Sequence, residues 1–292
     1  MRRRFATLDV FTDRRFAGNP LAVVLEPQGL EGDAMQAIAR EFSHPETVFV
    51  FAPADPGHRA RLRIFTPARE LPFAGHPTVG TAVLLALSDR ASAGSDLVLE
   101  EGIGPVRCTL EAVSAGRGSA RFALPQLSTQ AGSAPDAAAV AAGLALSPGD
   151  IDGTPARWSA GNPLSFVPIR SLAAVARCRP DPVKFEAAFG ATGAAYVFCK
   201  ETAEPGHHFH ARMFAPGLGF AEDPATGSAA AAFAGLIAPQ LADGEHAIVI
   251  EQGYEMGRPS LMRVTAGVSG GRLNSAAIGG DAVVVTEGTL EA

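Results

Sequence analysis

The sequence is poor in the residues and motifs that mark several familiar classes of enzyme. Its 292 residues include three cysteines, Cys108, Cys178 and Cys199, whose spacing matches no metal-binding or Cys-x-x-Cys redox pattern. Free cysteine is usually buried, so we interpret all three as buried thiols in a reducing compartment. The sequence also has no GxSxG, P-loop, HExxH or Rossmann glycine motif in a fitting context. These absences exclude the common signatures of serine hydrolases, nucleotide-binding enzymes and zinc peptidases, and we expect no cofactor.

Charged residues and long apolar runs are also scarce. Charged side chains make up 18% of the chain, the net charge is -6, and basic residues are dispersed apart from Arg2, Arg3 and Arg4, so we expect no nucleic-acid partner. No segment approaches the roughly 20 apolar residues that cross a bilayer, and Asp9 and Asp13 interrupt the stretch that would follow a signal-peptide start. The hydrophobic fraction of 47% suffices for a sizeable core. We therefore expect a globular cytoplasmic protein without a membrane partner.

What the sequence does contain is an internal repeat. Four short motifs recur in the same order, with offsets of 143 to 151 residues, which is about half the length of the chain. Four matches at nearly constant spacing are a poor fit to chance, so they predict two halves with the same fold that face each other across a pseudo-twofold axis. The matched pairs are residues 18–24 with 161–167, 63–67 with 212–216, 76–82 with 223–229, and 99–102 with 250–253.

The repeat predicts two domains. Residues 126–136 combine Ser, Gly and Pro after an apolar run, which is typical of a linker. We place the domains at 1–126 and 127–292. The sequence leaves open whether the last strand, at 282–286, returns to the first half.

Both halves have the pattern of an α+β protein. Short apolar or β-branched runs at 48–51, 97–99, 247–250 and 282–285 predict strands. Two helices are predicted to begin at Pro77 and Pro224, because proline is favoured at the first helical position, and Asp223 is a favoured N-cap. Both helices are apolar on all sides, so we expect them to be buried against the surrounding sheets.

The starts of these two helices are candidate binding positions for an anion. The first turn of a helix leaves backbone N–H groups unpaired and carries a partial positive charge. If the two starts converge on a cleft between the halves, they can hold a small carboxylate substrate. The repeat differs at this point, because His76 in the first half corresponds to Asp223 in the second, which suggests divided roles for two titratable residues.

Glu46 is the third candidate catalytic residue. It precedes the apolar strand at 48–51 and follows a turn-like Ser-His-Pro. A carboxyl group at the edge of a buried element can both donate and accept a proton. The histidines His207, His208 and His210 could bind a metal ion, but no second cluster supports them and we expect no metal site. Proton transfer without a cofactor is the chemistry that remains.

Several of these motifs together resemble the phenazine-biosynthesis (PhzF-like) isomerase family, which shares the diaminopimelate epimerase-like fold. The resemblance is spread over most of the chain, and the strings Gly-His-Pro-Thr and Glu-Asp-Pro-Ala-Thr-Gly-Ser-Ala are its most specific parts. It implies two pseudo-symmetric domains, each a curved, mostly antiparallel sheet or barrel around a central buried helix, and a homodimer. The matching stretches are residues 9–12, 16–20, 46–47, 63–67, 70–78 and 222–229.

The resemblance also implies roles for particular residues. In such enzymes the glutamate that matches Glu46 shuttles a proton between two carbons of a small cyclic carboxylate, similar to trans-2,3-dihydro-3-hydroxyanthranilate. The residues that match His76 and Asp223 position polar groups on the substrate. Positions around the substrate, where backbone N–H groups can hold a carboxylate, match Gly75, Gly227 and Ser228.

Two other functions stay open. One is an amino-acid racemase or epimerase that uses His76 and Asp223 as its two bases. Related epimerases use cysteines at the two helix starts, whereas the three cysteines here lie elsewhere, which makes a two-thiol mechanism a poor fit. The other is a carboxylate-binding protein without catalytic turnover.

Overall fold

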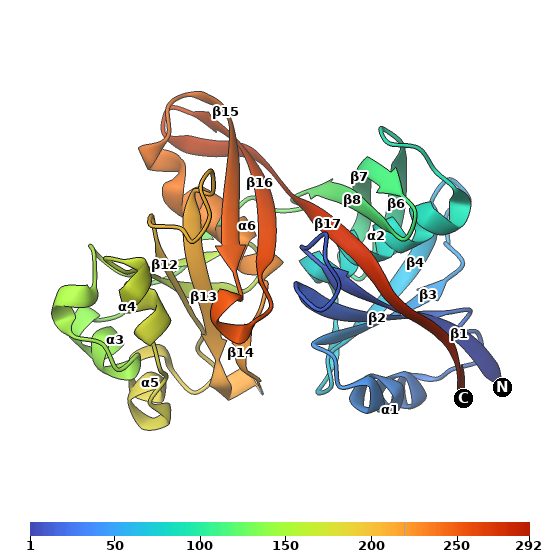
Figure 1. Ribbon diagram of the computed structural model, residues 1–292, viewed down its shortest axis with the longest axis horizontal. Helices are drawn as coiled ribbons and strands as arrows, with labels where there is room; N and C mark the ends of the chain where they lie inside the picture. The colour runs from blue at the N-terminus through green and yellow to red at the C-terminus, as the bar shows by residue number, and fades with distance from the viewer. Residues whose placement is uncertain (219) are drawn as a thin grey trace. The chain divides into compact units, whose positions relative to one another are not determined.

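The computed structural model describes residues 1–218 and 220–292, and the chain forms two compact units (Figure 1). Unit 1 comprises Met1–Ala123 and Gly279–Ala292, and unit 2 comprises Leu124–Ile278. The division after Ala123 lies close to the boundary at 126 that the linker composition suggests. The last strand, β17 (Arg272–Glu291), continues from unit 2 into unit 1, where its second part pairs with β1 (Arg2–Val10) in antiparallel fashion.

Unit 1 is a closed eight-stranded barrel around a buried helix. Going round the barrel, the described strands pair in the order β1, β2, β3, β4, β6, β7, β8 and β17, and β17 closes on β1. The pairs β2–β3 and β4–β6 are parallel, whereas β1 pairs with β2 and β17, β3 with β4, and β7 with β6 and β8 in antiparallel fashion. The elements introduced here are β2 (Asn19–Leu25), α1 (Gly32–Phe42), β3 (Glu46–Phe51), β4 (Ala60–Phe65), β5 (Glu70–Leu71), α2 (Gly75–Asp89), β6 (Asp96–Glu101), β7 (Gly104–Ser114) and β8 (Arg117–Ala123).

Helix α2 fills the interior of this barrel. Every residue from Gly75 to Ala86 is buried, as expected of a helix without a polar face. Gly80 allows the helix to approach the barrel wall, because a Cβ atom there would lie 2.6 Å from the Leu21 side chain and 2.7 Å from that of Val10. The absence of a side chain at this position therefore sets how closely α2 packs on β1 and β2.

Unit 2 repeats the same pairing scheme. The β10–β11 pair is antiparallel, β11–β12 parallel, β12–β13 and β13–β14 antiparallel, β13–β15 parallel and β15–β16 antiparallel, which is the order of β1 to β7 in unit 1. The strands are β9 (Thr129–Gln130), β10 (Ala156–Ser159), β11 (Pro163–Pro168), β12 (Ala195–Cys199), β13 (Phe209–Ala215), β14 (Phe220–Asp223), β15 (Gly244–Gln252) and β16 (Ser260–Ser269). The helices are α3 (Ala137–Gly143), α4 (Leu172–Arg177), α5 (Pro182–Phe189) and α6 (Gly227–Ile237), with 3-10 turns at Pro148–Asp150, Pro216–Leu218, Ala238–Gln240 and Tyr254–Met256.

The core of unit 2 gathers around α6. Phe233 of this helix packs its ring against those of Phe166, Phe198 and Phe209, with ring centroids 6.0, 4.7 and 4.8 Å away. Helices α3, α4 and α5 pack over a second cluster of buried side chains that includes Phe185. Helix α6 thus occupies the central position in its unit that α2 occupies in unit 1.

The four matched sequence motifs fall on equivalent elements of the two units. They lie on β2 and β11, on β4 and β13, at the approaches to α2 and α6, and on β6 and β15. A side-chain contact repeats as well, because Arg63 forms a two-pronged ion pair with Glu70 just as Arg212 does with Glu222. The predicted α+β class, with two domains that share a strand scheme and are each built around a buried helix, is confirmed.

The predicted starts of the two helices need correction. Helix α2 begins at Gly75 rather than at Pro77. Helix α6 begins at Gly227, and its N-cap is Thr226, so Asp223 is not an N-cap but the last residue of β14. The reason is that Asp223 pairs with β13 through the sheet ladder, and the chain can turn into the helix only after it leaves that ladder.

No helix in the described part of the chain combines the length and the apolar character needed to cross a bilayer.

Candidate active site

The structure brings Glu46 and His76 into contact, although 30 residues separate them in the sequence. Glu46 is the first residue of β3, where it is paired with Leu21 of β2, and His76 is the second residue of α2. The Nε2 atom of His76 lies 3.2 Å from Oε2 of Glu46. The side chains retain 6% and 16% of their exposure respectively, so the two groups meet in a largely desolvated place.

His76 is neutral at physiological pH. The pKa of its imidazole is lowered to about 3, mainly by burial and also by the nearby His44, and a hydrogen bond to the Pro20 carbonyl opposes the change only in part. A neutral imidazole carries one N–H. Proline has only a carbonyl to offer, so the ring donates that N–H to Pro20.

The first turn of α2 places backbone N–H groups beside this pair. Ala74 is the N-cap residue, with extended backbone and no side-chain cap, and Gly75 and His76 open the helix. The N–H groups of a helix's first turn lack intrahelical partners and lie at the positive end of its dipole. This is a suitable position for the carboxylate group of a small molecule.

Thr78 and Glu101 lie behind this turn, and the sequence analysis did not select either of them. Oγ1 of Thr78 is 2.8 Å from the carbonyl oxygen of Ala74 and 2.8 Å from Oε1 of Glu101. Glu101 is 8% exposed, and burial raises the pKa of its carboxyl group to about 8, although the hydrogen bond with Thr78 partly opposes that rise. Glu101 lies within one of the matched motifs, where Gln252 is its counterpart. This difference between the two halves is the feature by which the sequence could have identified Glu101.

In unit 2 the predicted residues gather at the end of β14 and the start of α6. Oδ2 of Asp223 accepts a hydrogen bond from Oγ1 of Thr226. Nε2 of Gln252 donates to the backbone carbonyl of Asp223 at 2.7 Å and to Oγ1 of Thr226 at 3.1 Å. Gly227 and Ser228 are the first two residues of α6, the former buried and the latter half-buried. Gln252 therefore fixes both the backbone of Asp223 and the residue that holds its side chain.

The glutamate has no counterpart in the repeat. Thr47 of β3 and Ala195 of β12 pair with the same position of the matched Arg-x-Phe motif in the next strand. Glu46 in unit 1 therefore corresponds to Ala194 in unit 2. The two units share a fold but not a set of titratable groups, and only unit 1 has a carboxyl group at this position.

The histidines that could suggest a metal site belong instead to an ionic network. Nδ1 of His207 and Nδ1 of His210 lie 2.6 and 2.7 Å from the two carboxylate oxygens of Glu251, and Nε2 of His210 lies 2.9 Å from Glu255. His208 accepts a hydrogen bond from a backbone N–H of β15. Among the described residues, no group of three or more His, Cys, Asp or Glu side chains is arranged to hold a metal ion.

This network has a smaller relative in unit 1, which reveals a fifth repeated motif. Glu100 accepts hydrogen bonds from two backbone N–H groups in residues 54–58, and Nδ1 of His58 lies 2.9 Å from the same carboxylate. Residues 203–207 hold Glu251 in the same way. The two loops read Ala-Asp-Pro-Gly-His and Ala-Glu-Pro-Gly-His, so the motif was visible in the sequence. Its presence in both units indicates a structural role for His207.

None of the three cysteines belongs to the first turn of α2 or α6, since Cys108 lies on β7, Cys178 follows α4 and Cys199 ends β12. All three are buried, and burial raises the pKa of Cys178 and Cys199 to about 12 and that of Cys108 further. Neutral thiols at these positions cannot act as the pair of bases in a racemase.

Comparison with known proteins identifies the family. Residues 8–288 match the family model described as phenazine biosynthesis-like protein. The chain is 49% identical over 303 residues to an uncharacterized isomerase of Mesorhizobium japonicum, covering 99% of this chain and 98% of that protein. It is 36% identical over 288 residues to the trans-2,3-dihydro-3-hydroxyanthranilate isomerase of Pseudomonas aeruginosa, with 98% of each chain covered.

Solved structures agree with this result. The crystal structure of a PhzF-family phenazine biosynthesis protein of Bacillus anthracis matches with a TM-score of 0.90 at 26% identity and covers 100% of both chains. A probable proline racemase of Agrobacterium radiobacter, at 12% identity and a TM-score of 0.67, shares the fold; it covers 99% of this chain and 93% of its own. The chain belongs to the phenazine biosynthesis-like (PhzF-like) family of isomerases.

Proposed function

We propose that this protein is a cofactor-independent isomerase that moves a proton between two carbons of a small cyclic carboxylate resembling trans-2,3-dihydro-3-hydroxyanthranilate. Glu46 acts as both the general base and the general acid. The observation that carries the proposal is the 3.2 Å contact between the Glu46 carboxyl group and a neutral, buried His76. The name of the Pseudomonas aeruginosa relative supports the choice of substrate class.

One carboxyl group suffices for the reaction. Ionised Glu46 removes a proton from one carbon of the substrate, and the resulting carboxylic acid returns the proton to a second carbon while the double bonds shift between them. The proton is conserved and no electrons leave the substrate, so an isomer is the only product. Enclosure of the carboxyl group limits exchange of this proton with water between the two steps.

His76 assists by accepting the proton of Glu46 in a hydrogen bond. With its N–H directed to Pro20, which we assign to Nδ1, its Nε2 carries a lone pair that faces Oε2 of Glu46. The protonated carboxyl group formed halfway through the reaction can donate to this lone pair. The ring therefore stabilises the intermediate form of Glu46 and keeps its carboxyl group oriented toward the substrate.

Backbone groups hold the carboxylate of the substrate in this scheme. The first-turn N–H groups at Gly75 and His76 are the candidates in unit 1. On unit 2 we propose Asp223 for contact with polar groups of the substrate, and Gly227 and Ser228 for further hydrogen bonds. The Gln252 contacts to Asp223 and Thr226 support a fixed orientation of that carboxylate.

The test is isomerisation in deuterated water. The protein is incubated with trans-2,3-dihydro-3-hydroxyanthranilate, and product formation and deuterium uptake are followed by NMR. Glu46→Gln should lose at least about 1,000-fold in kcat, a loss consistent with removal of a general acid/base, and should still bind the substrate. Glu41→Gln, an exposed neighbour on α1, is the matched control and should keep full turnover.

Full turnover by Glu46→Gln would refute the single-carboxylate mechanism. Loss of optical activity from small amino acids, abolished by His76 or Asp223 variants, would favour the racemase instead. Binding without hydrogen exchange in any carboxylate would favour a protein without turnover.

We further propose a homodimer, as the family resemblance implies, and a location in the cytoplasm, as the composition of the sequence suggests. Light scattering coupled to gel filtration tests the first point, since a dimer has twice the 30.0 kDa mass of the chain. Cell fractionation tests the second.

A further inference from the structure

The hydroxyl group of Thr78 lies between two oxygen atoms and has only one proton to share. Its Oγ1 is 2.8 Å from the Ala74 carbonyl oxygen and 2.8 Å from Oε1 of Glu101. A carbonyl oxygen accepts hydrogen bonds and cannot donate one, and the same is true of an ionised carboxylate. If Glu101 were ionised, one of these two short contacts would contain no hydrogen. A proton on Glu101 satisfies both, because Glu101 then donates to Thr78 and Thr78 donates to Ala74.

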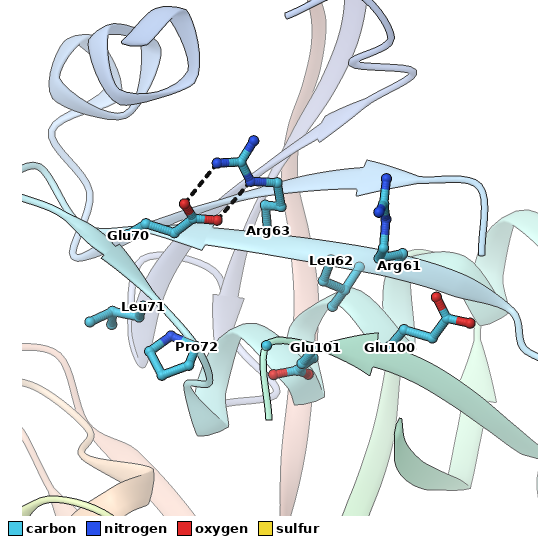
Figure 2. A pocket seen from close by; sticks show the side chains of 9 residues that line it. Arg61, Leu62, Arg63, Glu70, Leu71, Pro72, Glu100 and Glu101 are labelled. Carbon is cyan, nitrogen blue, oxygen red and sulfur yellow. Dashed lines mark hydrogen bonds and ion pairs between the residues drawn. The ribbon is translucent and has the colours of Figure 1, made fainter. Parts of the chain in front are cut away.

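The surroundings of Glu101 also favour a neutral side chain. Its Oε2 atom is buried and has no hydrogen-bond partner in the part of the chain that the structure describes. Ionising a buried carboxyl group with such an oxygen would carry a large desolvation penalty. Figure 2 shows that Glu101 and Leu62 point to one side of the β4–β6 layer, while Arg61, Arg63 and Glu100 point to the other. The two arginines thus provide no counter-charge for Glu101.

The titratable groups on every element packed against Glu101 fit this picture. Strand β6 lies between β4 and β7, and Glu101 reaches α2 through Thr78. The inward-facing titratable group on β7 is the buried Cys108, a neutral thiol whose pKa is raised mainly by burial. The remaining ones on these elements are Arg61 and Arg63 on β4, Asp96 and Glu100 on β6, Arg107 and Glu111 on β7, and His76 and Asp89 on α2.

The second half of the repeat shows what this position does. Gln252 is the counterpart of Glu101, and its Nε2 donates hydrogen bonds to the Asp223 carbonyl and to Oγ1 of Thr226, at the start of α6. An amide group and a protonated carboxyl group have the same shape, and each can donate and accept. Both units thus place a donor of this shape beneath the start of their central helix.

We propose that Glu101 is a positioning residue that works as a neutral acid: its proton completes the chain from Glu101 through Thr78 to the Ala74 carbonyl and so fixes the first turn of α2, which carries Gly75 and His76. The proposal rests on the function assigned above to His76. Burial as the main cause raises the pKa of Glu101 to about 8, so the acid form prevails at neutral pH.

Ionisation of Glu101 should loosen this turn. Above about pH 8 the Thr78 hydroxyl donates its hydrogen bond to the Glu101 carboxylate instead of to the Ala74 carbonyl. The Ala74 carbonyl then loses its side-chain partner. His76 then sits on a less constrained turn, and turnover should fall about tenfold for each further pH unit, as expected when one proton must be retained. Glu101→Gln supplies a hydrogen-bond donor that does not ionise, so this decline in turnover at alkaline pH should disappear in that variant.

The experiment combines NMR with kinetics on the full-length protein. With ¹³C-labelled glutamate and ¹⁵N-labelled histidine, one carboxyl carbon should titrate near pH 8 and be missing in Glu101→Gln. The His76 ring resonances should shift with the same midpoint in the wild type and stay constant in Glu101→Gln. The exposed Glu245→Gln is the control and should behave as the wild type. Glu101→Leu, which has no donor, should lose at least about tenfold in kcat at every pH.

Either of two results would overturn the proposal: a Glu101 carboxyl group that titrates below pH 6, or His76 resonances that keep the same alkaline midpoint in Glu101→Gln. Both NMR measurements need no substrate. If they succeed while trans-2,3-dihydro-3-hydroxyanthranilate is not converted, the proposed reaction is wrong and the positioning role of Glu101 stands.

Discussion

Substitution of Glu251 by glutamine tests the ionic network of unit 2 and its weaker counterpart in unit 1. Glu251 is fully buried and accepts hydrogen bonds from Ala203, His207 and His210. Burial alone would lower the pKa of His210, but its hydrogen bonds to Glu251 and Glu255 prevail and raise it to about 9, so the ring is charged at neutral pH. Removing one partner of a buried ion pair typically costs about 3–5 kcal/mol, because the remaining charge stays desolvated.

For Glu251→Gln we expect the free energy of unfolding to fall by about 3 kcal/mol. This is the lower end of that range, because Glu255 still faces His210. In a chain of this size such a loss lowers Tm by about 6–12 °C. Glu100→Gln is the matched variant, with the same loop contacts but a side chain that keeps 14% of its exposure, and it should lower Tm less. Thermal unfolding followed by circular dichroism measures both. Equal shifts for the two variants, or a shift under about 2 °C for Glu251→Gln, would refute the reasoning.

Three further predictions concern stability. The pKa of His210 is raised from 6.5 to about 9, so its contribution to the stability of the fold is complete below pH 6.5 and is lost as the pH rises through 9. Tm should therefore decline over this interval in the wild type and decline less in Glu251→Gln. Gly253→Ala should cost about 1–3 kcal/mol in urea unfolding, since Gly253 has a φ of 79° and a Cβ would lie 2.4 Å from the Arg258 carbonyl oxygen and 2.6 Å from that of Pro224; unchanged stability would contradict this. Tyr196→Phe should leave Tm unchanged or raise it, because the buried hydroxyl of Tyr196 has no hydrogen-bond partner among the described residues, and a clear drop in Tm would show that a partner exists.

The sequence predicted the fold correctly where a short pattern of residues is enough to set the structure. The repeated motifs predicted that the two units share a fold, and the apolar character of α2 and α6 predicted their burial, because a helix without a polar face has to be covered. The family resemblance also rested on contiguous strings around Glu46, His76 and Asp223. The helix starts were less predictable, since the ladder between β13 and β14 overrides the capping preference of Asp223.

By itself, therefore, the sequence determined the duplication, the fold class and the titratable residues at which the two halves differ. Only the tertiary structure decided the state of those residues. The contact of Glu46 with His76, the neutrality of His76 and the contact of Thr78 with Glu101 all depend on strands and helices that are distant in the chain. A pKa is set by the burial and the charges around a group, and these come from neighbours in space, which no local pattern of residues specifies.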